Sequence, residues 1–294
     1  MSENDRLAER FEENRTRLRA VAYRILGSLS EADDAVQESW LRLSRSDSSE
    51  IENLGGWLTT VVARLSLNML RSRQSRREEP LDVQFPDPIV SGGDAVHPEH
   101  AALLADSIGL ALFVVLETLA PDERLAFVLH DMFAVPFDQI APIVGRSPMA
   151  ARQLASRARR RVKGSAPAPD ADLARQREVV DAFLAAARAG DFDALLAVLD
   201  PDVVRHADHR VEAPGRVRVL RGARAVAEGA LILSHIPEVR PAIVNGAAGL
   251  VGLNHAGRLV SVVGFTVSHG KIVEIDVFVD PARLRRLDVS ALQG

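Results

Sequence analysis

The stretch FDQIAPIVGRSPMAARQLASRARRRV, residues 137–162, decides the fold of this part of the chain. Up to Val144 its apolar residues recur at helical spacing, and Gly145 then marks a turn. Ser147 is a favoured helix N-cap, and Pro148 stands at the first helical position, where its missing N–H costs nothing. This order of signals predicts two helices joined by a tight turn, which is a helix-turn-helix.

The second of these helices is strongly basic. From Arg146 to Lys163 there are seven basic residues and no acid, and a second acid-free run from Arg64 to Arg77 holds five arginines. A solvated helix face is the plain explanation of such runs, but their place on a helix-turn-helix favours phosphate binding. The net charge of −4 over 294 residues therefore does not exclude nucleic acid, because the basic residues are concentrated on two helices.

The first eighty residues are expected to be helical. Apolar residues recur at helical spacing over residues 11–26, over a helix that starts near Ser30, and over a third helix at about 54–77. Trp40 and Trp57 stand among aliphatic residues at that spacing. We therefore expect both rings to lie in the core rather than to stack on bases.

Two aperiodic segments divide the rest of the chain. Residues 81–102 contain Pro and Gly repeatedly, and residues 165–172 are rich in Ala and Pro, so both are predicted to be linkers. Beyond them, helices at about 173–189 and 192–199 precede several strand-like segments, and SHGK at 268–271 predicts a hairpin turn. This pattern indicates an α+β module with a curved antiparallel sheet.

The composition excludes several classes of protein. The chain has no cysteine, which excludes disulfides, Cys-ligated metals and thiol nucleophiles. The N-terminal MSENDRLAER has no apolar core, so we do not expect a secretory signal. The most apolar stretch, residues 108–116, is far shorter than the roughly 20 residues of a membrane helix. We therefore expect a soluble cytoplasmic protein.

Three segments in order resemble sigma-70-type transcription factors. Residues 22–43, AYRILGSLSEADDAVQESWLRL, resemble the core-polymerase-binding segment, residues 55–77 the promoter −10 segment, and residues 116–162 the −35-reading domain. The pattern is similar to the extracytoplasmic-function group (group 4), which keeps only these two sigma domains. The resemblance implies two all-α domains, region 2-like over 1–80 and helix-turn-helix region 4-like over 103–164, that bind core RNA polymerase and promoter DNA.

The remainder, residues 173–294, resembles a SnoaL-like, nuclear-transport-factor-like domain, in which helices and a curved sheet surround a pocket. VDPARLRRL at 279–287 is similar to the terminal Asn-Pro-Asp-Lys-Leu-type motif of sigma factors with such a tail. Two stretches depart from that subgroup: RHADHRVEAPG at 205–215 replaces an Asp-Gly-Gly-Gly-Lys-type stretch, and VQFPDP at 83–88 replaces a Trp-Leu-Pro-Glu-Pro-type linker. The resemblance implies that the tail contacts the sigma domains and regulates them in cis.

Candidate site residues follow for each expected partner. Docking on core polymerase suits an acidic helix and implies Asp33, Asp34, Gln37 and Glu38, although Asp33 and Asp34 also suit the first turn of any helix. For the −10 element we expect a base contact from the loop at 44–53 and phosphate contacts from the next helix: Asn53, Asn68, Arg71, Arg73, Arg76 and Arg77.

The second helix of a helix-turn-helix enters the major groove with its N-terminal residues nearest the base edges. That geometry nominates the base-facing residues Ser147, Met149, Ala150, Arg152, Gln153 and Ser156. Further along the same helix, phosphate contacts are expected from Arg157, Arg159 and Arg160.

A candidate tail pocket contains His206, Asp208 and His209. Positions 206 and 208 of one strand share a face, so a His–Asp pair there could act as a base and its orienting partner, or bind metal. Polar residues at a strand end are the plainer interpretation, and we favour it; we expect no catalytic residue, cofactor or metal. The alternative function is a ligand-sensing or enzymatic tail, of small-molecule isomerase or hydrolase type, attached to a DNA-binding module. A conventional helix-turn-helix regulator would leave residues 22–77 unexplained.

Overall fold

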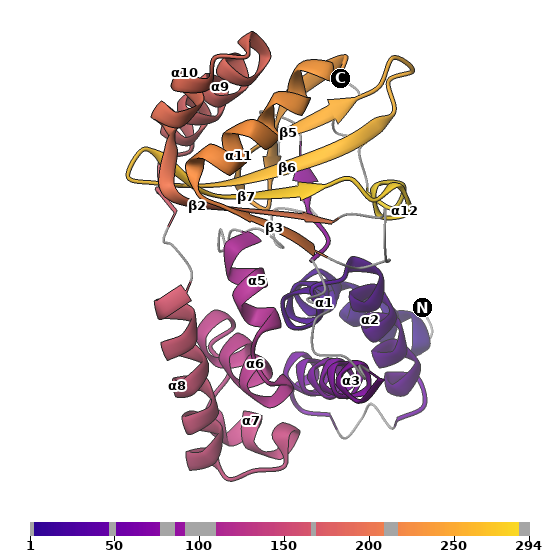
Figure 1. The fold of residues 1–294 in the computed structure, drawn as a ribbon. Helices are drawn as coiled ribbons and strands as arrows, with labels where there is room; N and C mark the ends of the chain where they lie inside the picture. Colours follow the sequence, from indigo (N-terminus) through magenta and orange to yellow (C-terminus); the bar gives the residue numbers. More distant parts are fainter. Residues whose placement is uncertain are drawn as a thin grey trace. The chain divides into compact units, whose positions relative to one another are not determined.

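The computed structural model describes residues 3–46, 51–76, 86–91, 110–165, 169–208 and 217–287. They form two compact units (Figure 1). The described residues up to 76 and those of 115–165 make up a helical unit, and those of 86–91, 110–114 and 169–287 make up an α+β unit. Over these residues, no helix is both long enough and apolar enough to cross a membrane.

The helical unit begins with three long helices, α1 (Glu3–Leu26), α2 (Leu29–Leu43) and α3 (Leu54–Arg76). The hydroxyl of Ser28 accepts the first-turn N–H of Glu31, so the cap of α2 lies two residues before the predicted one. Trp40 is half-buried, with its ring 5.1 Å from that of Phe11. Trp57 is also half-buried, so the expected core position of the two rings holds only in part.

Helix α5 (Leu110–Glu117) is divided between the units, and only its residues from 115 onward belong to the helical one. The helical unit continues with α6 (Pro121–Phe127), a π-helical turn η2 (Val128–Met132), α7 (Phe137–Val144) and α8 (Pro148–Ser165). Gly145 ends α7 in the left-handed conformation, with φ of 67°, a backbone state that glycine adopts at little cost. Helices α7 and α8 thus form the predicted helix-turn-helix.

In the α+β unit, α9 (Leu173–Ala189) and α10 (Phe192–Val198) precede β2 (Leu199–Asp208) and β3 (Val217–Arg221). Helix α11 (Ala223–Ala230) and the turn η3 (Leu231–His235) lead into the remaining strands. These are β4 (Glu238–Val244), β5 (Ala247–Leu253), β6 (Leu259–Ser268) and β7 (Lys271–Phe278), followed by the short helix α12 (Pro281–Leu284). With β1 (Val90–Ser91) from the N-terminal half of the chain, the strand order is β1-β4-β5-β6-β7-β2-β3.

The predicted hairpin at 268–271 is confirmed, because Ser268 pairs with Lys271. His269 and Gly270 both have positive φ, 52° and 73°, the backbone of a two-residue turn that matches the twist of its strands. The sheet is not wholly antiparallel as predicted, since β7 leaves this hairpin to run parallel to β2.

Part of the predicted linker 81–102 belongs to the C-terminal sheet. Strand β1 (Val90–Ser91) pairs antiparallel with β4, Val90 opposite Val244. The N–H of Ile89 donates to Asn245 Oδ1 at 2.6 Å, and the N–H of Asn245 donates back to the carbonyl of Ile89 at 2.8 Å. Val90 and Ser91 therefore form an edge strand of the sheet, and Ile89 is held beside it.

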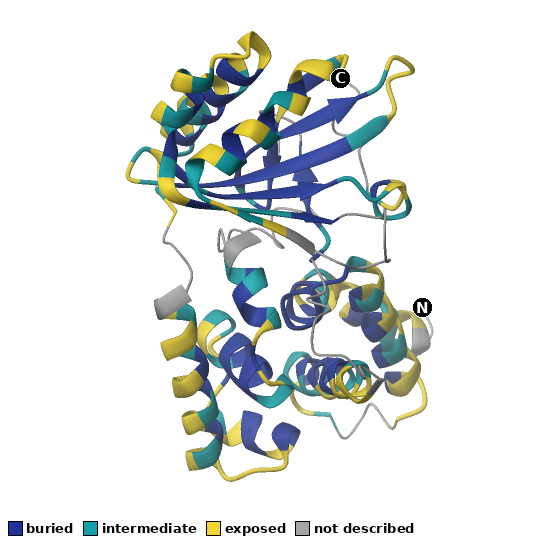
Figure 2. Ribbon diagram, viewed as in Figure 1, coloured by how far each residue is buried: buried dark blue, intermediate teal, exposed yellow. Residues whose placement is uncertain are grey.

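The sheet carries apolar cores on both faces. One face packs against α9, α10 and α11 through residues such as Phe183, Val226 and Ile275. The other carries a smaller cluster that includes Val90 of β1 and Leu284 of α12. Figure 2 shows the strands largely buried and the outward faces of the covering helices exposed.

Candidate promoter and polymerase interfaces

Helix α8 has one buried and one exposed face. The hydroxyl of Ser147 accepts the N–H of Ala150 at 3.2 Å, which caps the helix as predicted. Ala151, Ala155 and Ala158 are completely buried and fix the helix on the domain. The exposed residues include Met149, Arg152, Gln153, Ser156, Arg157 and Arg160, and Met149 is 72% exposed. The residues nominated to read bases therefore share an accessible surface, except for Ala150, which is half-buried.

Acidic residues hold the arginines in the second half of α8. Arg157 and Arg161 each bind the carboxylate of Glu123 at 2.8 Å, and that carboxylate is only 8% exposed. Arg159 pairs with Asp131 at 2.7 Å. These ion pairs orient the arginine side chains, which remain about half exposed to solvent. Arg160 is also exposed on the helix.

Arg152 is oriented by a different contact. Its guanidinium carbon lies 5.4 Å from the centre of the Phe137 ring, and that ring stacks on His130 with centroids 3.8 Å apart. Cations favour such a position over an aromatic face. The side chain is thus placed at the start of α8 while remaining exposed.

The nominated residues of α3 lie in different environments. Asn68 and Arg71 are exposed, and Arg71 pairs with Asp122 of α6 at 2.7 Å. The oxygen of Asn53 accepts the N–H of Gly56 at 2.9 Å, so this side chain caps the start of α3. The side chain of Arg76, all of Arg77, and residues 47–50 of the candidate base-binding loop lie outside the described residues.

Arg73, also nominated as a phosphate ligand, makes its contacts within the helical unit. Its side chain is 13% exposed, and the guanidinium pairs with Glu31 of α2 and donates to the carbonyl of Leu26 at 3.0 Å. The signal that distinguishes it from Arg71 is non-local, because Glu31 is 42 residues away in sequence. Its contacts are those of a residue that ties α3 to the junction of α1 and α2.

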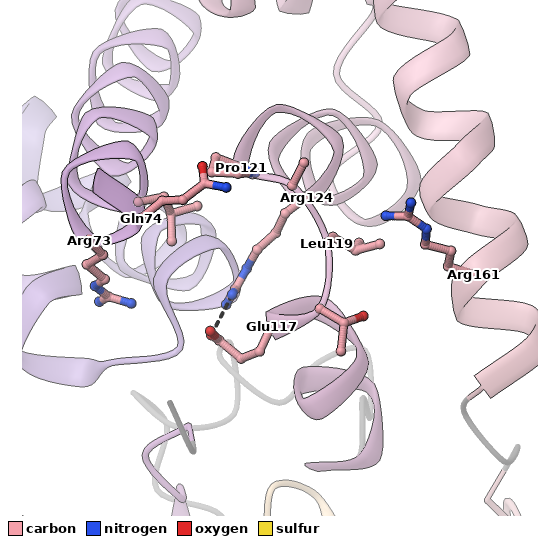
Figure 3. Close-up of a pocket in the computed structure, with 10 residues that line it drawn as sticks. Arg73, Gln74, Glu117, Leu119, Pro121, Arg124 and Arg161 are labelled. Carbon is pink, nitrogen blue, oxygen red and sulfur yellow. Dashed lines mark hydrogen bonds and ion pairs between the residues drawn. The ribbon is translucent and has the colours of Figure 1, made fainter. Parts of the chain in front are cut away.

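A pocket of about 360 Å³ lies within the helical unit, beside Arg73. Figure 3 shows Arg124 of α6 reaching toward Glu117, with Gln74 on one side and Arg161 on the other. Arg124 and Glu117 are joined at 2.5 Å and are 2% and 6% exposed. Removing one partner of such a pair leaves a buried charge, so it is a structural element of the domain.

The acidic residues nominated for polymerase binding lie along α2. Asp33, Asp34 and Gln37 are exposed, and Glu38 is half-buried. Asp33 pairs with Arg19 at 2.6 Å and Glu38 with Arg42 at 3.0 Å. A groove of about 200 Å³ brings apolar residues of α1 and α2 together with two of the four candidates, and its lining includes Phe11, Val36, Trp40, Asp33 and Gln37. This surface offers a partner both charge and apolar contact.

Comparison with known proteins identifies the family. The chain matches the models of sigma-70 region 2 over residues 10–76 and sigma-70 region 4 over residues 110–162. It is 42% identical over 279 residues to the ECF RNA polymerase sigma factor SigJ of Mycobacterium tuberculosis, covering 89% of this chain and 88% of SigJ. The chain belongs to the extracytoplasmic-function sigma factors.

One further relative and one crystal structure match nearly the whole chain. The probable ECF RNA polymerase sigma factor SigI of M. tuberculosis is 36% identical over 289 residues, or 97% of both chains. The crystal structure of M. tuberculosis SigJ matches with a TM-score of 0.76 and 37% identity, covering 96% of this chain and 99% of that one. As an extracytoplasmic-function sigma factor the protein directs transcription initiation and is not an enzyme. Sigma factors bind core RNA polymerase and promoter DNA.

The C-terminal domain of this sigma factor contains an apolar cavity, which we call the tail cavity. Its volume is about 370 Å³, and its lining includes Phe183, Val226, Leu233, Val263 and Ile275. Arg205 and Ser261 also line it, and the hydroxyl of Ser261 is buried without a hydrogen-bond partner among the described residues. Neither His206 nor Asp208 is among the lining residues, so the candidate tail pocket was assigned to the wrong side chains. Side chains alternate along a strand, which places Arg205 on the cavity face and its neighbour on the other.

His206 and Asp208 are not surface residues of a strand end either. Their side chains are 13% and 8% exposed. Nδ1 of His206 lies 3.1 Å from Glu274 Oε1 and 3.2 Å from Asp276 Oδ1. Burial alone would lower the pKa of His206, but the two carboxylates raise it to about 9. Burial raises the pKa of Asp276 to about 7.

Asp208 belongs to a separate set of contacts at the end of β2. Its Oδ1 accepts the N–H groups of Val279 at 2.5 Å and Asp280 at 3.2 Å. Arg283 lies 3.5 Å from its other oxygen and 2.9 Å from Asp87. Burial raises the pKa of Asp208, although the two backbone N–H groups and the charge of Arg283 act to lower it. His209 lies outside the described residues.

Proposed function

We propose that the C-terminal domain regulates this sigma factor in cis by holding the linker between the two sigma domains. The observation that carries the proposal is the edge strand β1, which places linker residues in the C-terminal sheet. The ion pair of Asp87 with Arg283 and the paired hydrogen bonds of Ile89 and Asn245 add to the backbone pairing. Together these contacts hold four residues of the linker, Asp87, Ile89, Val90 and Ser91.

The linker is a suitable point of control because it sets the reach of the two domains. The proposed region 2-like domain, 1–80, and region 4-like domain, 103–164, are joined by residues 81–102, and residues 165–172 join the tail. An extended chain spans about 3.3–3.6 Å per residue. Holding residues 87–91 on the C-terminal domain shortens the part of the linker that is free to span the promoter, whereas their release restores it.

Promoter-specific transcription with core polymerase tests this proposal. Asp87→Asn and Arg283→Gln weaken the hold on the linker, and Arg285→Gln is the matched control, because Arg285 is exposed in the same segment. Loss of about 1 kcal/mol of docking energy shifts the held population about fivefold. We expect both variants to change transcription in the same direction, and a chain truncated at about residue 166 to change it further. Equal transcription by all variants would overturn the proposal.

The two sigma domains supply the contacts with polymerase and promoter in this proposal. Core polymerase docks on Asp33, Asp34, Gln37 and Glu38 of α2, supported by the groove beside them. The −10 element is held by Asn53, Asn68 and Arg71, and the −35 element by the exposed face of α8. The factor then works in the cytoplasm, with the polymerase. Asp34→Arg should abolish co-purification with core enzyme while leaving the fold intact, since Asp34 is exposed; undiminished co-purification would remove this surface from the proposal.

The tail cavity favours a second candidate function, the sensing of a small apolar ligand. A largely apolar cavity with a few polar groups is the usual form of a ligand site. Arg205 and the hydroxyl of Ser261 would read one polar or anionic group of that ligand. Thermal-shift titration with short fatty acids tests binding, and transcription with the same ligand tests sensing. A ligand that stabilises wild-type protein but not Ala230→Trp, which fills the cavity, is the expected result; equal stabilisation of both would reject it.

A further inference from the structure

Three ionisable side chains converge on the sheet face opposite the tail cavity. His206 lies on β2, and Glu274 and Asp276 lie on the parallel strand β7. The register pairs His206 with Asp276, and Glu274 precedes Asp276 by two residues, so all three project from one face. One ring nitrogen of His206 and one oxygen of each carboxylate lie within 4.8 Å of one another. In the described part of the chain, no other three His, Asp or Glu side chains come this close together.

The cluster is buried and its charges are unequal. The side chains of Asp276, Glu274 and His206 are 1%, 9% and 13% exposed. Nδ1 of His206 faces both carboxylates, yet a ring nitrogen carries one hydrogen at most and cannot donate a full hydrogen bond to each. Even a charged imidazole leaves an excess of negative charge beside two ionised carboxylates. Buried charge of this kind is costly unless it is paired or coordinates a metal ion.

The separations match those between ligands of one ion. A metal ion about 2.1 Å from an imidazole nitrogen and from a carboxylate oxygen holds these atoms about 3.0–3.4 Å apart. Nδ1 of His206 is 3.1 Å from Glu274 Oε1 and 3.2 Å from Asp276 Oδ1. Strand β6 is the other neighbour of β7, and its residue opposite Asp276 is Gly264, which brings no side chain to the site.

We propose that His206, Glu274 and Asp276 form a site for one divalent transition-metal ion of the Zn²⁺ or Mn²⁺ type. An imidazole with two carboxylates suits these ions, whereas Mg²⁺ and Ca²⁺ prefer oxygen ligands throughout. The ion replaces the proton between the imidazole and the carboxylates, because a metal-bound imidazole is neutral.

The site adjoins the contacts that hold the linker. His206 and Asp208 are on the same strand and face, and Asp208 accepts the N–H groups that follow β7. An ion bound to both strands stabilises the β2–β7 pair at the residues next to Arg283 and Asp87. The binding of metal itself does not depend on the regulatory role proposed for the tail.

Calorimetric titration of the chelator-treated full-length protein with Zn²⁺ tests the site. We expect one equivalent bound, a rise in the Tm of the C-terminal domain of about 5–10 °C at an ion concentration about 100-fold above Kd, and no rise with Mg²⁺. Surface histidines also bind Zn²⁺, so His235→Ala, at an exposed histidine, is the matched control and should bind as the wild type does.

Asp276→Asn keeps the shape of the side chain and removes one charged ligand, so affinity should fall about 100-fold or more. Glu274→Gln is the second variant, for use if the first folds poorly, and should lower affinity in the same way. Mn²⁺ paramagnetic resonance on unmodified protein counts sites without any variant. The assignment is overturned if wild-type protein shows no saturable binding of either ion, or if only His235→Ala abolishes it.

Discussion

Arg283 of α12 and Asp87 of the linker form an ion pair, with 2.9 Å between Nη2 and Oδ1. The two residues are 196 positions apart in sequence. Their side chains are 21% and 24% exposed, so the pair is partly shielded from solvent. The same guanidinium lies 3.5 Å from Asp208 at the end of β2. The segment after β7 thereby fastens the linker to the sheet.

Loss of this ion pair should loosen the linker without unfolding the domain. Arg283→Gln is expected to cost about 1 kcal/mol of local stability and to raise hydrogen exchange at the amide of Ile89 about fivefold. That amide donates to Asn245, so its exchange reports the docking of β1. Arg285→Gln should leave exchange unchanged, and equal exchange in both variants would contradict the role of the pair.

The two halves of α8 should contribute differently to promoter binding. Arg152→Ala is expected to cost about 1–3 kcal/mol at the cognate −35 element and to relax its sequence preference. Arg160→Ala should weaken binding to all sequences and reduce the salt dependence by about one phosphate contact. Fluorescence anisotropy with cognate and scrambled duplexes, at several salt concentrations, measures both effects. An equal loss on both duplexes for Arg152→Ala would show that it does not read bases.

Substitutions at Arg71 and at Arg73 should differ in their effects on DNA affinity and on the stability of the helical unit. Arg73→Gln leaves Glu31 without its partly buried partner and is expected to destabilise the helical unit by about 1–3 kcal/mol. Arg71→Gln removes an exposed pair with Asp122 and should cost at most about 1 kcal/mol of stability, while lowering DNA affinity. Urea unfolding and duplex binding of the two variants test this division; similar stability losses in both would count against it.

Local signals carried most of the successful sequence predictions. The helix-turn-helix followed from Gly145, Ser147 and Pro148, each of which acts on its own backbone. The hairpin at 268–271 followed in the same way, from small and polar residues between two apolar runs. The resemblance to sigma factors then placed these elements in a known order.

Apart from the cap of α2, the main failures involved contacts between residues far apart in sequence. Nothing near Val90 indicates that it pairs with Val244, and nothing near Arg73 separates it from Arg71. Strand alternation put His206 and Asp208 on one face but gave no indication of which face enclosed the cavity. Arg205 was missed for that reason, although its position directly before His206 already assigned it to the opposite face.

The second linker is fastened by a carboxylate whose effect depends on pH. Asp170 Oδ1 accepts the N–H of His269 at 2.9 Å and Oδ2 that of Gly270 at 3.0 Å, at the turn between β6 and β7. These hydrogen bonds lower the pKa of Asp170 below its usual 3.8. A carboxyl group with a lowered pKa in the folded state stabilises that state above pH 3.8, and the contribution is lost as the pH falls through the folded-state pKa.

Asp170→Asn should therefore lower the stability of the C-terminal domain near neutral pH. The stability of the variant should also fall less steeply than that of the wild type as the pH is lowered. Urea unfolding of wild type and variant between pH 6 and about pH 3 measures the difference, which is expected to shrink as the pH falls. Asp193→Asn is the control, because Asp193 lies in the first turn of α10 and not at the hairpin. A difference that stays constant over this range would show that the Asp170 contact does not depend on its charge.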